Sequence, residues 1–524
     1  MIALLAFLAL GQTVEKTIAA KEEILPRVVV TVHLDQVIGP ISPYIYGTND
    51  DRSQAWTAAK RHTMGRLGGN RWTAYNWETN ASNAGNDWHH QNDGYLSKSD
   101  EPARAVTDRL DVIQKHGAPV LVTVPIQGWV AADKKGDGDV AKSGKDYLKQ
   151  RFVENRAWNP NPTKVFPNLT DGAVFQDEFV RFLEARRQRN HAPTIWYSLD
   201  NEPDLWRQTH ARIQSAPLDR KAFFDRSIQF AKAVKREAPD ALVFGPAVSG
   251  WMGITTGGAG KFDRQHYFID DYLDAFNQMR PFDRGPLKGK PLLDVLDVHW
   301  YPEHRSEKGV RVTSDSGADD VTAARAQAPR SLYDRGFREN SWITNDVLHQ
   351  PIALLSRLQD SIARHHRDAK LAVTEYYFAG GADPSGAVAQ ADVLGAFGRY
   401  GIFAANLFHI GRTDDRYILA AFDLYRNYDG QGGRFGDQSL WTEGGDDMVS
   451  AYAATEGSLV TVVLINREGK RAGVRLDFTE PVKIAAAKRY QVAAPTPRPV
   501  EVEAVNLGDL VLPPMSATMI VVPR

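Results

Sequence analysis

The chain has 524 residues, 43% hydrophobic and 24% charged, which is typical of globular proteins and long enough for two or more domains. Lysine and arginine number 63 against 64 acidic residues, so the net charge is −1 and the basic excess of a nucleic-acid binder is missing. Cysteine is absent, which excludes thiol catalysis, disulfides and cysteine-ligated zinc. The 12 tryptophans and 18 tyrosines fit a flat, neutral ligand such as a sugar.

Residues 1–25 resemble a secretory signal. The apolar run from Ile2 to Leu10 is too short to span a bilayer and matches a signal core. No lysine or arginine precedes it, and Ala19 and Ala20 form only a loose cleavage site. We therefore expect a secreted protein with an imperfect signal and no other membrane-crossing segment.

Eight short apolar runs follow between residues 41 and 425. In chain order they are SPYIYGTND, MGRLGGN, APVLVTVPIQGWV, TIWYSLDNEP, ALVFGPAVSG, LLDVLDVHWYP, LAVTEYYFAG and GIFAANLFHI. Helical spacing lies between them over residues 103–116, 177–189, 221–237, 343–366 and 386–399. Eight strands alternating with helices predict an α/β fold, a (β/α)₈ TIM-like barrel. An open doubly wound sheet is the alternative, but no glycine-rich phosphate loop follows an early strand.

Two further segments frame the barrel. The polar connection over residues 303–342 is expected to form a long loop on the rim after the sixth strand. Residues 426–524 read as short strands and turns without helical spacing, which predicts an all-β sandwich. The isolated strand within residues 26–40 is expected to add to that sandwich, making the second domain discontinuous.

Candidate site residues occur where the barrel strands end, because barrel active sites lie at that face. Two glutamates, Glu202 and Glu375, stand among aromatic and amide side chains, as glycoside hydrolysis requires. The other candidates for binding substrate are Asn201, Arg66, Asn70, Trp72, Tyr75, Trp77, Trp129, Trp206, His299, Trp300, Tyr301 and Tyr377. The alternative for the aromatic residues is ordinary packing in the barrel rim.

Glu375 interrupts an otherwise apolar-to-aromatic strand. An isolated buried carboxylate is costly, so it needs a partner or a function. Strand periodicity places Leu371, Val373 and Glu375 on one side, facing the barrel axis. The alternative is a purely structural ion pair with Arg66 or Arg71.

Glu202 ends another buried strand. An exposed turn is the alternative there, since aspartate, asparagine and proline are common turn residues. Its position beside Asn201 and Pro203 at a second strand end favours catalysis.

Longer strings carry a family resemblance. YSLDNEPDLW, MGRLGGNRWTAYNWE and LAVTEYYF resemble glycoside hydrolase family 44, endo-β-1,4-glucanases that also cleave xyloglucan. The resemblance runs from ISPYIYGTN through QAPRSLYD and ENSWI to the final strands, so it covers nearly the whole chain. The Asn-Glu-Pro string alone is less specific, because many retaining barrel glycosidases share it.

The resemblance implies a retaining double displacement with Glu202 as acid/base and Glu375 as nucleophile. The chemistry agrees, because the acid needs a raised pKa while the nucleophile stays ionised. By analogy with other such barrels, Asn201 would bond the sugar 2-hydroxyl, and Tyr301 and Arg66 would donate to Glu375. No cofactor is required for the chemistry.

The resemblance also implies a bound metal ion, with structural calcium as a candidate. The weak candidate ligands Asp133, Asp137 and Asp139 lie in ADKKGDGDVAK, which lacks a calcium loop's spacing and closing glutamate; a solvated loop is the alternative. His299 and His304 are expected to be hydrogen-bonded rather than metal-bound.

We expect a monomeric retaining endo-β-1,4-glucanase that cleaves internal bonds of cellulose-type glucans, with xyloglucan or xylan as further substrates. Its partner is a β-1,4-linked polysaccharide or oligosaccharide, with no nucleic acid and no membrane. The rival functions are an exo-acting retaining glycosidase, of the arabinofuranosidase or xylosidase kind, and a non-catalytic carbohydrate-binding protein.

Overall fold

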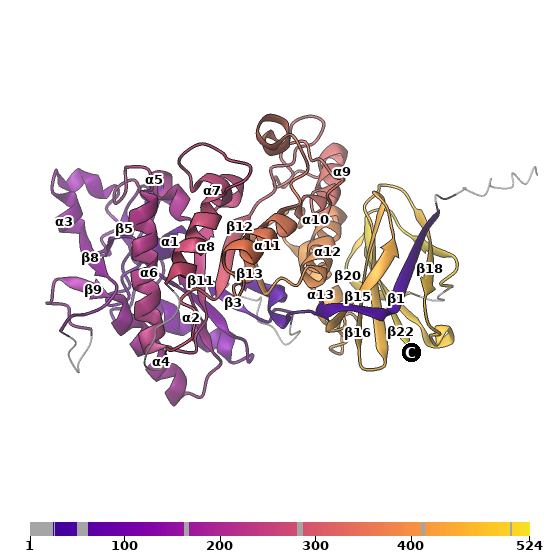
Figure 1. Cartoon of the computed structure of the whole chain (residues 1–524), viewed down its shortest axis with the longest axis horizontal. Helices are drawn as coiled ribbons and strands as arrows, with labels where there is room; N and C mark the ends of the chain where they lie inside the picture. The colour runs from indigo at the N-terminus through magenta and orange to yellow at the C-terminus, as the bar shows by residue number, and fades with distance from the viewer. Residues whose placement is uncertain are drawn as a thin grey trace, which may run out of the picture.

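The computed structural model describes residues 25, 27–49, 61–161, 167–279, 287–409, 414–502 and 506–524. Residues 1–24 of the predicted signal lie outside the described residues, so secretion stays a prediction. Figure 1 shows a barrel and a smaller β domain, with the strand β1 (Arg27–Pro40) running between them. Within the ranges above, no helix combines the length and the apolar character needed to cross a bilayer.

Eight parallel strands close into a barrel, which confirms the predicted fold. Each predicted apolar run supplies one strand. They are β2 (Gly47–Asn49), β3 (Gly65–Leu67), β6 (Val120–Val124), β10 (Ile195–Leu199), β11 (Val243–Val248), β12 (Val295–Trp300), β13 (Lys370–Tyr376) and β14 (Ala404–Leu407). Their order around the barrel follows the chain, so the carboxyl ends of all eight strands meet at one mouth.

Helices surround the barrel. The longer ones are α2 (Arg104–Gln114), α4 (Gln176–Arg189), α6 (Arg220–Glu237), α8 (Phe268–Gln278), α11 (Leu354–His365), α12 (Pro384–Arg399) and α13 (Arg416–Arg426). The prediction of one continuous helix over residues 343–366 is wrong. A π-helical stretch (Ile343–Leu348) is followed by His349 and Ala353 in left-handed conformation, and Pro351 lies between them, so α11 begins only at Leu354.

Shorter elements fill the connections near the mouth. They are α1 (Asn70–Thr73), β4 (Ser82–Asn83), η2 (Gly85–Asp87), β5 (Asn92–Asp93), β7 (Trp129–Ala131), β8 (Phe152–Arg156), β9 (Ala173–Phe175), η4 (Pro203–Leu205), α5 (Trp206–Thr209) and α7 (Gly250–Thr256). The connection over residues 303–342, predicted as a loop, contains α9 (Asp319–Gln327) and α10 (Arg330–Tyr333). Buried Arg325 orders it by donating to the carbonyls of Val312 and Ser314.

The base of the barrel interior is apolar. Seven side chains form one compact cluster, and each comes from a different barrel strand or the residue just before it: Met64, Leu121, Trp196, Phe244, Val295, Ala372 and Ala404. Only side chains that point to the barrel axis can meet in this way. The cluster therefore fixes which positions of each strand face inward.

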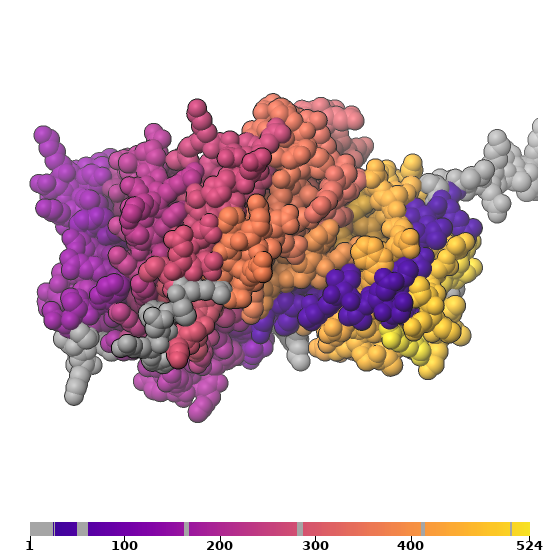
Figure 2. Space-filling view, in the orientation of Figure 1, coloured from indigo at the N-terminus to yellow at the C-terminus, as the bar shows by residue number. Residues whose placement is uncertain are grey.

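The second domain is a nine-stranded sheet that encloses its own apolar core. Its strands are β1, β15 (Gln438–Gly444), β16 (Val449–Glu456), β17 (Leu459–Asn466), β18 (Ala472–Phe478), β19 (Lys488–Ala493), β20 (Thr496–Val502), β21 (Leu510–Leu512) and β22 (Ser516–Pro523). β1 pairs antiparallel with β15 and parallel with β18, as expected for a discontinuous sandwich. Figure 2 shows β1 continuing along the surface from this domain to the barrel.

The helix α12 is shared by both domains. Every residue from Ser385 to Gly398 is buried, and the helix packs on α9 and α13 as well as on β16, β17 and β22. Asp392 of this helix pairs with Arg467 of the sandwich at 3.0 Å, with both side chains almost fully buried. The hydroxyl of Tyr452 also donates to Asp392, at 2.7 Å.

Candidate active site

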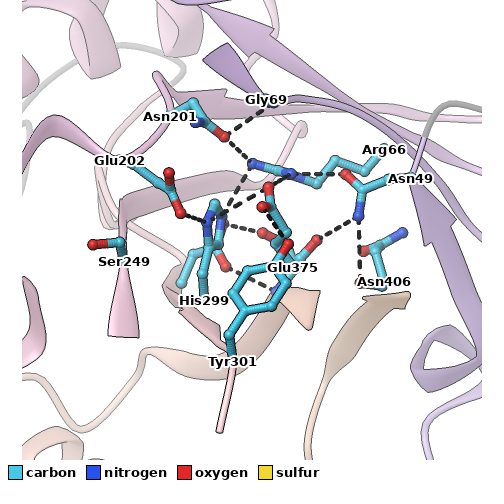
Figure 3. A network of polar contacts seen from close by, with 12 residues as sticks. Asn49, Arg66, Gly69, Asn201, Glu202, Ser249, His299, Tyr301, Glu375 and Asn406 are labelled. Atoms are coloured by element: carbon cyan, nitrogen blue, oxygen red, sulfur yellow. Dashed lines mark hydrogen bonds and ion pairs between the residues drawn. The ribbon is translucent and has the colours of Figure 1, made fainter. Parts of the chain in front are cut away.

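Glu202 and Glu375 meet at the mouth of the barrel, although they come from opposite sides of it (Figure 3). One carboxylate oxygen of each, together with a ring nitrogen of His299, lies within 4.8 Å of the others. The Glu202 side chain is 13% exposed and that of Glu375 is 7% exposed. Both carboxylates are therefore largely sheltered from solvent.

An irregularity in β13 turns Glu375 inward. Val298 of β12 pairs with Val373, but the next residue, His299, pairs with Glu375, so Thr374 is an extra residue in the strand. Ala372 faces the barrel axis, whereas Val373 packs in the outer core. The prediction that Leu371 and Val373 share the inward side with Glu375 is therefore wrong: both pack outside, and the bulge shifts the alternation so that Glu375 points to the mouth.

The Asp200–Glu202 segment is a rigid turn rather than a solvated one. Asp200 and Glu202 both have left-handed backbones, with φ of 67° and 43°. The Asp200 carboxylate accepts the backbone N–H groups of Ile126 and Gln127, at 2.6 and 3.1 Å, which ties the turn to the end of β6. The N–H of Glu202 donates to the Ala247 carbonyl, at 2.9 Å, and ties it to β11.

Arg66 is the centre of the network. Its fully buried guanidinium donates to Glu375 Oε2 at 2.9 Å, to Asn201 Oδ1 at 2.8 Å and to Asn49 Oδ1 at 2.7 Å. Asn201 Oδ1 also accepts the N–H of Gly69, at 3.0 Å. Because both donors hold the amide oxygen, the amide NH₂ of Asn201 is the end left for a ligand.

The contacts of His299 fix its tautomer. Arg66 can only donate, so its Nη2, 3.1 Å away, makes Nε2 of His299 an acceptor. The ring proton then sits on Nδ1, which donates to Glu202 Oε1 at 3.0 Å. Burial lowers the pKa of His299 to about 3, so the ring is neutral. With Oε1 occupied, Oε2 is the oxygen of Glu202 that can carry a proton toward a ligand.

The two glutamates are in different electrostatic environments. Burial raises the pKa of Glu202 to about 7, with Arg66 opposing and Asp87 adding to the shift. Glu375 instead accepts hydrogen bonds from Arg66 and from the Tyr301 hydroxyl, the latter at 2.7 Å. These donors stabilise the carboxylate form. Glu202 can thus hold a proton near neutral pH, whereas Glu375 is held by two hydrogen-bond donors.

Most aromatic residues predicted as sugar-binding surfaces are buried, so that prediction is wrong for Trp72, Tyr75, Trp77, Trp206, Trp300 and Tyr377. Trp77 stacks on Phe179. The Trp206 indole N–H donates to the Asn201 carbonyl at 3.2 Å and so supports the catalytic turn. Among the residues predicted to bind substrate, only Asn70, Trp129 and Tyr301 are partly exposed.

Two residues of interest were missed from the sequence. Asn49 lies in the first apolar run but was not among the candidates. It ends β2 and donates to the Thr374 carbonyl at 3.0 Å while it accepts from Arg66, so it joins β2 to the bulge in β13. Trp88 is 57% exposed and directly follows η2, which packs on α1 and α5 at the mouth. An exposed tryptophan beside a site is a signal that strand ends alone do not reveal.

The weak calcium candidates are neutralised by arginines. Asp133 and Asp137 both pair with Arg151, each at 2.7 Å. Asp139 pairs with Arg212, which holds the pKa of that carboxyl down at about 2. These ion pairs satisfy the three carboxylates without a metal, and a calcium site there remains a prediction.

A metal between Glu202, His299 and Glu375 is also disfavoured, although their donor atoms are close enough to share one. Arg66 already supplies a positive charge within 3.1 Å of both His299 and Glu375. His304 bonds the Asn340 N–H, at 2.9 Å, and lies outside this group.

Comparison with known proteins identifies the family. The profile of glycoside hydrolase family 44 matches residues 81–304. Endoglucanase A of Paenibacillus lautus is 38% identical over 458 residues, which is 83% of this chain and 63% of that protein. The structure of a family 44 xyloglucanase from Paenibacillus polymyxa with xyloglucan is 34% identical, with a TM-score of 0.85, and covers 95% of this chain and 100% of that one. The chain belongs to glycoside hydrolase family 44.

Membership of family 44 confirms the resemblance drawn from the sequence. Beta-mannanase/endoglucanase A of Caldicellulosiruptor saccharolyticus is a further relative, 35% identical over 495 residues. The family 44 chain spans 63% and 36% of the lengths of the two curated relatives, so both are longer proteins.

Proposed function

We propose that this family 44 chain is a retaining endo-β-1,4-glucanase that hydrolyses internal bonds of cellulose-type glucans. The observation that carries the proposal is the approach of Glu202 and Glu375, with one oxygen of each within 4.8 Å. Retaining glycosidases hold their carboxyl groups about 5 to 5.5 Å apart, whereas inverting enzymes need about 6.5 to 9.5 Å for a water molecule. The short separation favours direct attack by one carboxylate.

In the first step, Glu375 attacks the anomeric carbon and forms a glycosyl ester. The glycosidic C–O bond breaks, and the leaving oxygen takes the proton from Glu202 Oε2. In the second step, Glu202 accepts a proton from water, whose oxygen attacks the same carbon and releases Glu375. Two inversions give retention. Asn201, whose oxygen is held by Arg66 and Gly69, would direct its NH₂ group to the sugar 2-hydroxyl.

Substrate choice rests on the relatives. These relatives are named as an endoglucanase, a beta-mannanase/endoglucanase and a xyloglucanase. We propose xyloglucan as a second substrate after unbranched β-1,4-glucan, with xylan as a further expected one. Trp88 is the exposed aromatic residue best placed to stack on a sugar beyond the cleaved bond. The near-zero net charge fits a neutral glycan.

Structural calcium, implied by the family, fits a different pair of carboxylates from those predicted. Glu78 and Glu178 are both buried, and within the described part of the chain each has one oxygen without a hydrogen-bond partner. Burial, with Asp171 and Glu178 nearby, raises the pKa of Glu78 to about 8. Calcium bound by these oxygens would compensate their burial and link the connection after α1 to α4. If so, chelation should lower the melting temperature and calcium should restore it.

Product analysis tests the proposed function. An endo-acting enzyme should release mixed oligosaccharides early from carboxymethylcellulose and xyloglucan, and proton NMR should show the β-anomer first. An exo-acting glycosidase would release one short sugar from chain ends, and a carbohydrate-binding protein would bind without releasing reducing ends. An α-anomer as the first product would refute the retaining mechanism.

A further inference from the structure

A second group of ligand-type side chains, separate from the catalytic network, lies between the helices α8 and α11. His266 and Asp270 come from the start of α8, and His365 is the last residue of α11. The two helices pack against each other on the outside of the barrel (Figure 1). One donor atom from each of the three side chains lies within 4.8 Å of the others.

Asp270 is aimed into this group with one oxygen unused. The side chain is only 1% exposed. Its Oδ2 accepts the backbone N–H of Tyr267, at 2.8 Å, and caps the helix. Among the described residues its Oδ1 has no hydrogen-bond partner, and it lies 3.8 Å from His365 Nε2, too far for a hydrogen bond. A buried carboxylate oxygen left in this state is costly unless a cation binds it.

Both histidines are oriented by a second carboxylate. His266 Nε2 lies 2.7 Å from Asp271 Oδ1, and His365 Nδ1 lies 3.0 Å from Asp274 Oδ1. The remaining nitrogens, Nδ1 of His266 and Nε2 of His365, lie 4.0 and 3.8 Å from the Asp270 carboxylate. In metal sites, a ligating histidine nearly always donates its other ring N–H to a carboxylate or carbonyl in this way.

We propose that His266, Asp270 and His365 form a zinc site that links α8 to α11, with water completing the coordination. Two nitrogens and one oxygen suit Zn²⁺, and ligand atoms about 2.0 to 2.2 Å from one ion lie at most about 4 Å apart. The separations of 4.0 and 3.8 Å between the two histidines and Asp270 need only a small closure of the side chains to reach that geometry. Three carboxylates, those of Asp270, Asp271 and Asp274, lie in this region and attract a cation. Arg220, 3.1 Å from Asp271, neutralises one of them.

A competing explanation uses protons alone. The helix dipole stabilises carboxylates at the start of α8 and a protonated histidine at the end of α11, so the cluster would consist of simple ion pairs. That explanation leaves Asp270 Oδ1 without a partner. It also predicts no stoichiometric zinc binding, so the two explanations can be separated.

Zinc binding to the full chain, freed of metal by a chelator, tests the proposal. We expect one zinc ion per chain after gel filtration and a melting temperature that rises with zinc in the parent chain but not in Asp270→Asn. Asp270→Asn keeps an acceptor for the Tyr267 N–H but should abolish stoichiometric binding, as should His365→Gln. Asp274→Asn, which only orients a ligand, should weaken zinc binding about 10- to 100-fold.

His116→Ala, which removes an exposed histidine just after α2, is the matched control and should bind zinc as the parent does. Cellulase activity measured on each variant reports correct folding, because these residues are not in the catalytic network. A parent chain that retains no zinc would overturn the proposal. So would zinc binding that is unchanged in Asp270→Asn, His365→Gln and Asp274→Asn.

Discussion

Replacing His299 by phenylalanine should move the alkaline limb of the pH–rate profile upward. The ring donates its only proton to Glu202 Oε1, and this hydrogen bond stabilises the ionised form of Glu202 more than the protonated form. Phenylalanine removes the donor while it keeps the site apolar. The pKa of Glu202, raised to about 7 by burial, should therefore rise further. The acid then stays protonated to higher pH, although the peak rate falls because the acid is less well oriented.

The size of the shift follows from the bond that is lost. Hydrogen bonds to charged groups contribute about 1.5 to 3 kcal/mol, and one pKa unit corresponds to about 1.4 kcal/mol. The alkaline limb should therefore move up by about 1 to 2 pH units. The assay is kcat/KM against pH on an aryl cellotrioside whose leaving group needs a proton.

Tyr301→Phe is the matched control. It removes the donor to Glu375 and leaves the contacts of Glu202 in place, so it should lower kcat/KM without moving the alkaline limb. An alkaline limb that stays in place in His299→Phe, or moves down, would show that the neutral, Nδ1-protonated ring does not act on Glu202.

The remaining predictions test other parts of the chain. Glu202→Gln should slow polysaccharide hydrolysis about 10²- to 10⁴-fold but spare the first step on dinitrophenyl glycosides; equal losses would contradict its role as acid. Gly68→Ala places a methyl carbon 2.3 Å from the Arg66 guanidinium carbon, so kcat/KM should fall about 10²-fold even on activated substrates. Trp88→Ala should raise KM about 3- to 10-fold on long glucans and leave short aryl glycosides unchanged. Burial raises the pKa of Asp297 to about 7, so its protonated form stabilises the fold below about pH 4, and this contribution is lost as pH rises toward 7. Melting curves of Asp297→Asn should therefore depend less on pH across that window; an unchanged slope would exclude this carboxyl as the cause.

The barrel strands were predictable because each is a short apolar run bounded by turn residues. The direction of Glu375 was not, since it depends on the bulge at Thr374, and no periodicity in LAVTEYYF marks an extra residue. Simple strand alternation therefore selected Glu375 correctly, although its side chain points to the mouth because of the bulge and not because of the alternation.

The partners of the two glutamates were only partly predictable. Arg66 and Tyr301 stand at strand ends, where site residues are expected, and both donate to Glu375. Asn49 also stands at a strand end, where it accepts a hydrogen bond from Arg66, but nothing in SPYIYGTND marks it as a site residue. The tryptophans could not be sorted from the sequence. Nothing in the sequence distinguishes Trp77 and Trp300, which are buried, from Trp88, which is exposed; the packing of the structure does.

The burial of α12 on all sides determines how the protein can be divided. The sandwich supplies one wall of the space that this helix occupies, and Tyr452 reaches so close that a methyl group on Gly395 would lie 2.2 Å from its ring. Cutting the chain before β15 would expose an apolar helix face to water. It would also remove Arg467, the ion-pair partner of buried Asp392. Loss of one partner from a buried ion pair lowers the free energy of unfolding by about 3 to 5 kcal/mol. The barrel and the sandwich should therefore melt in a single calorimetric transition, and a catalytic fragment that ends at Arg426 should be insoluble although it contains every residue of the active site.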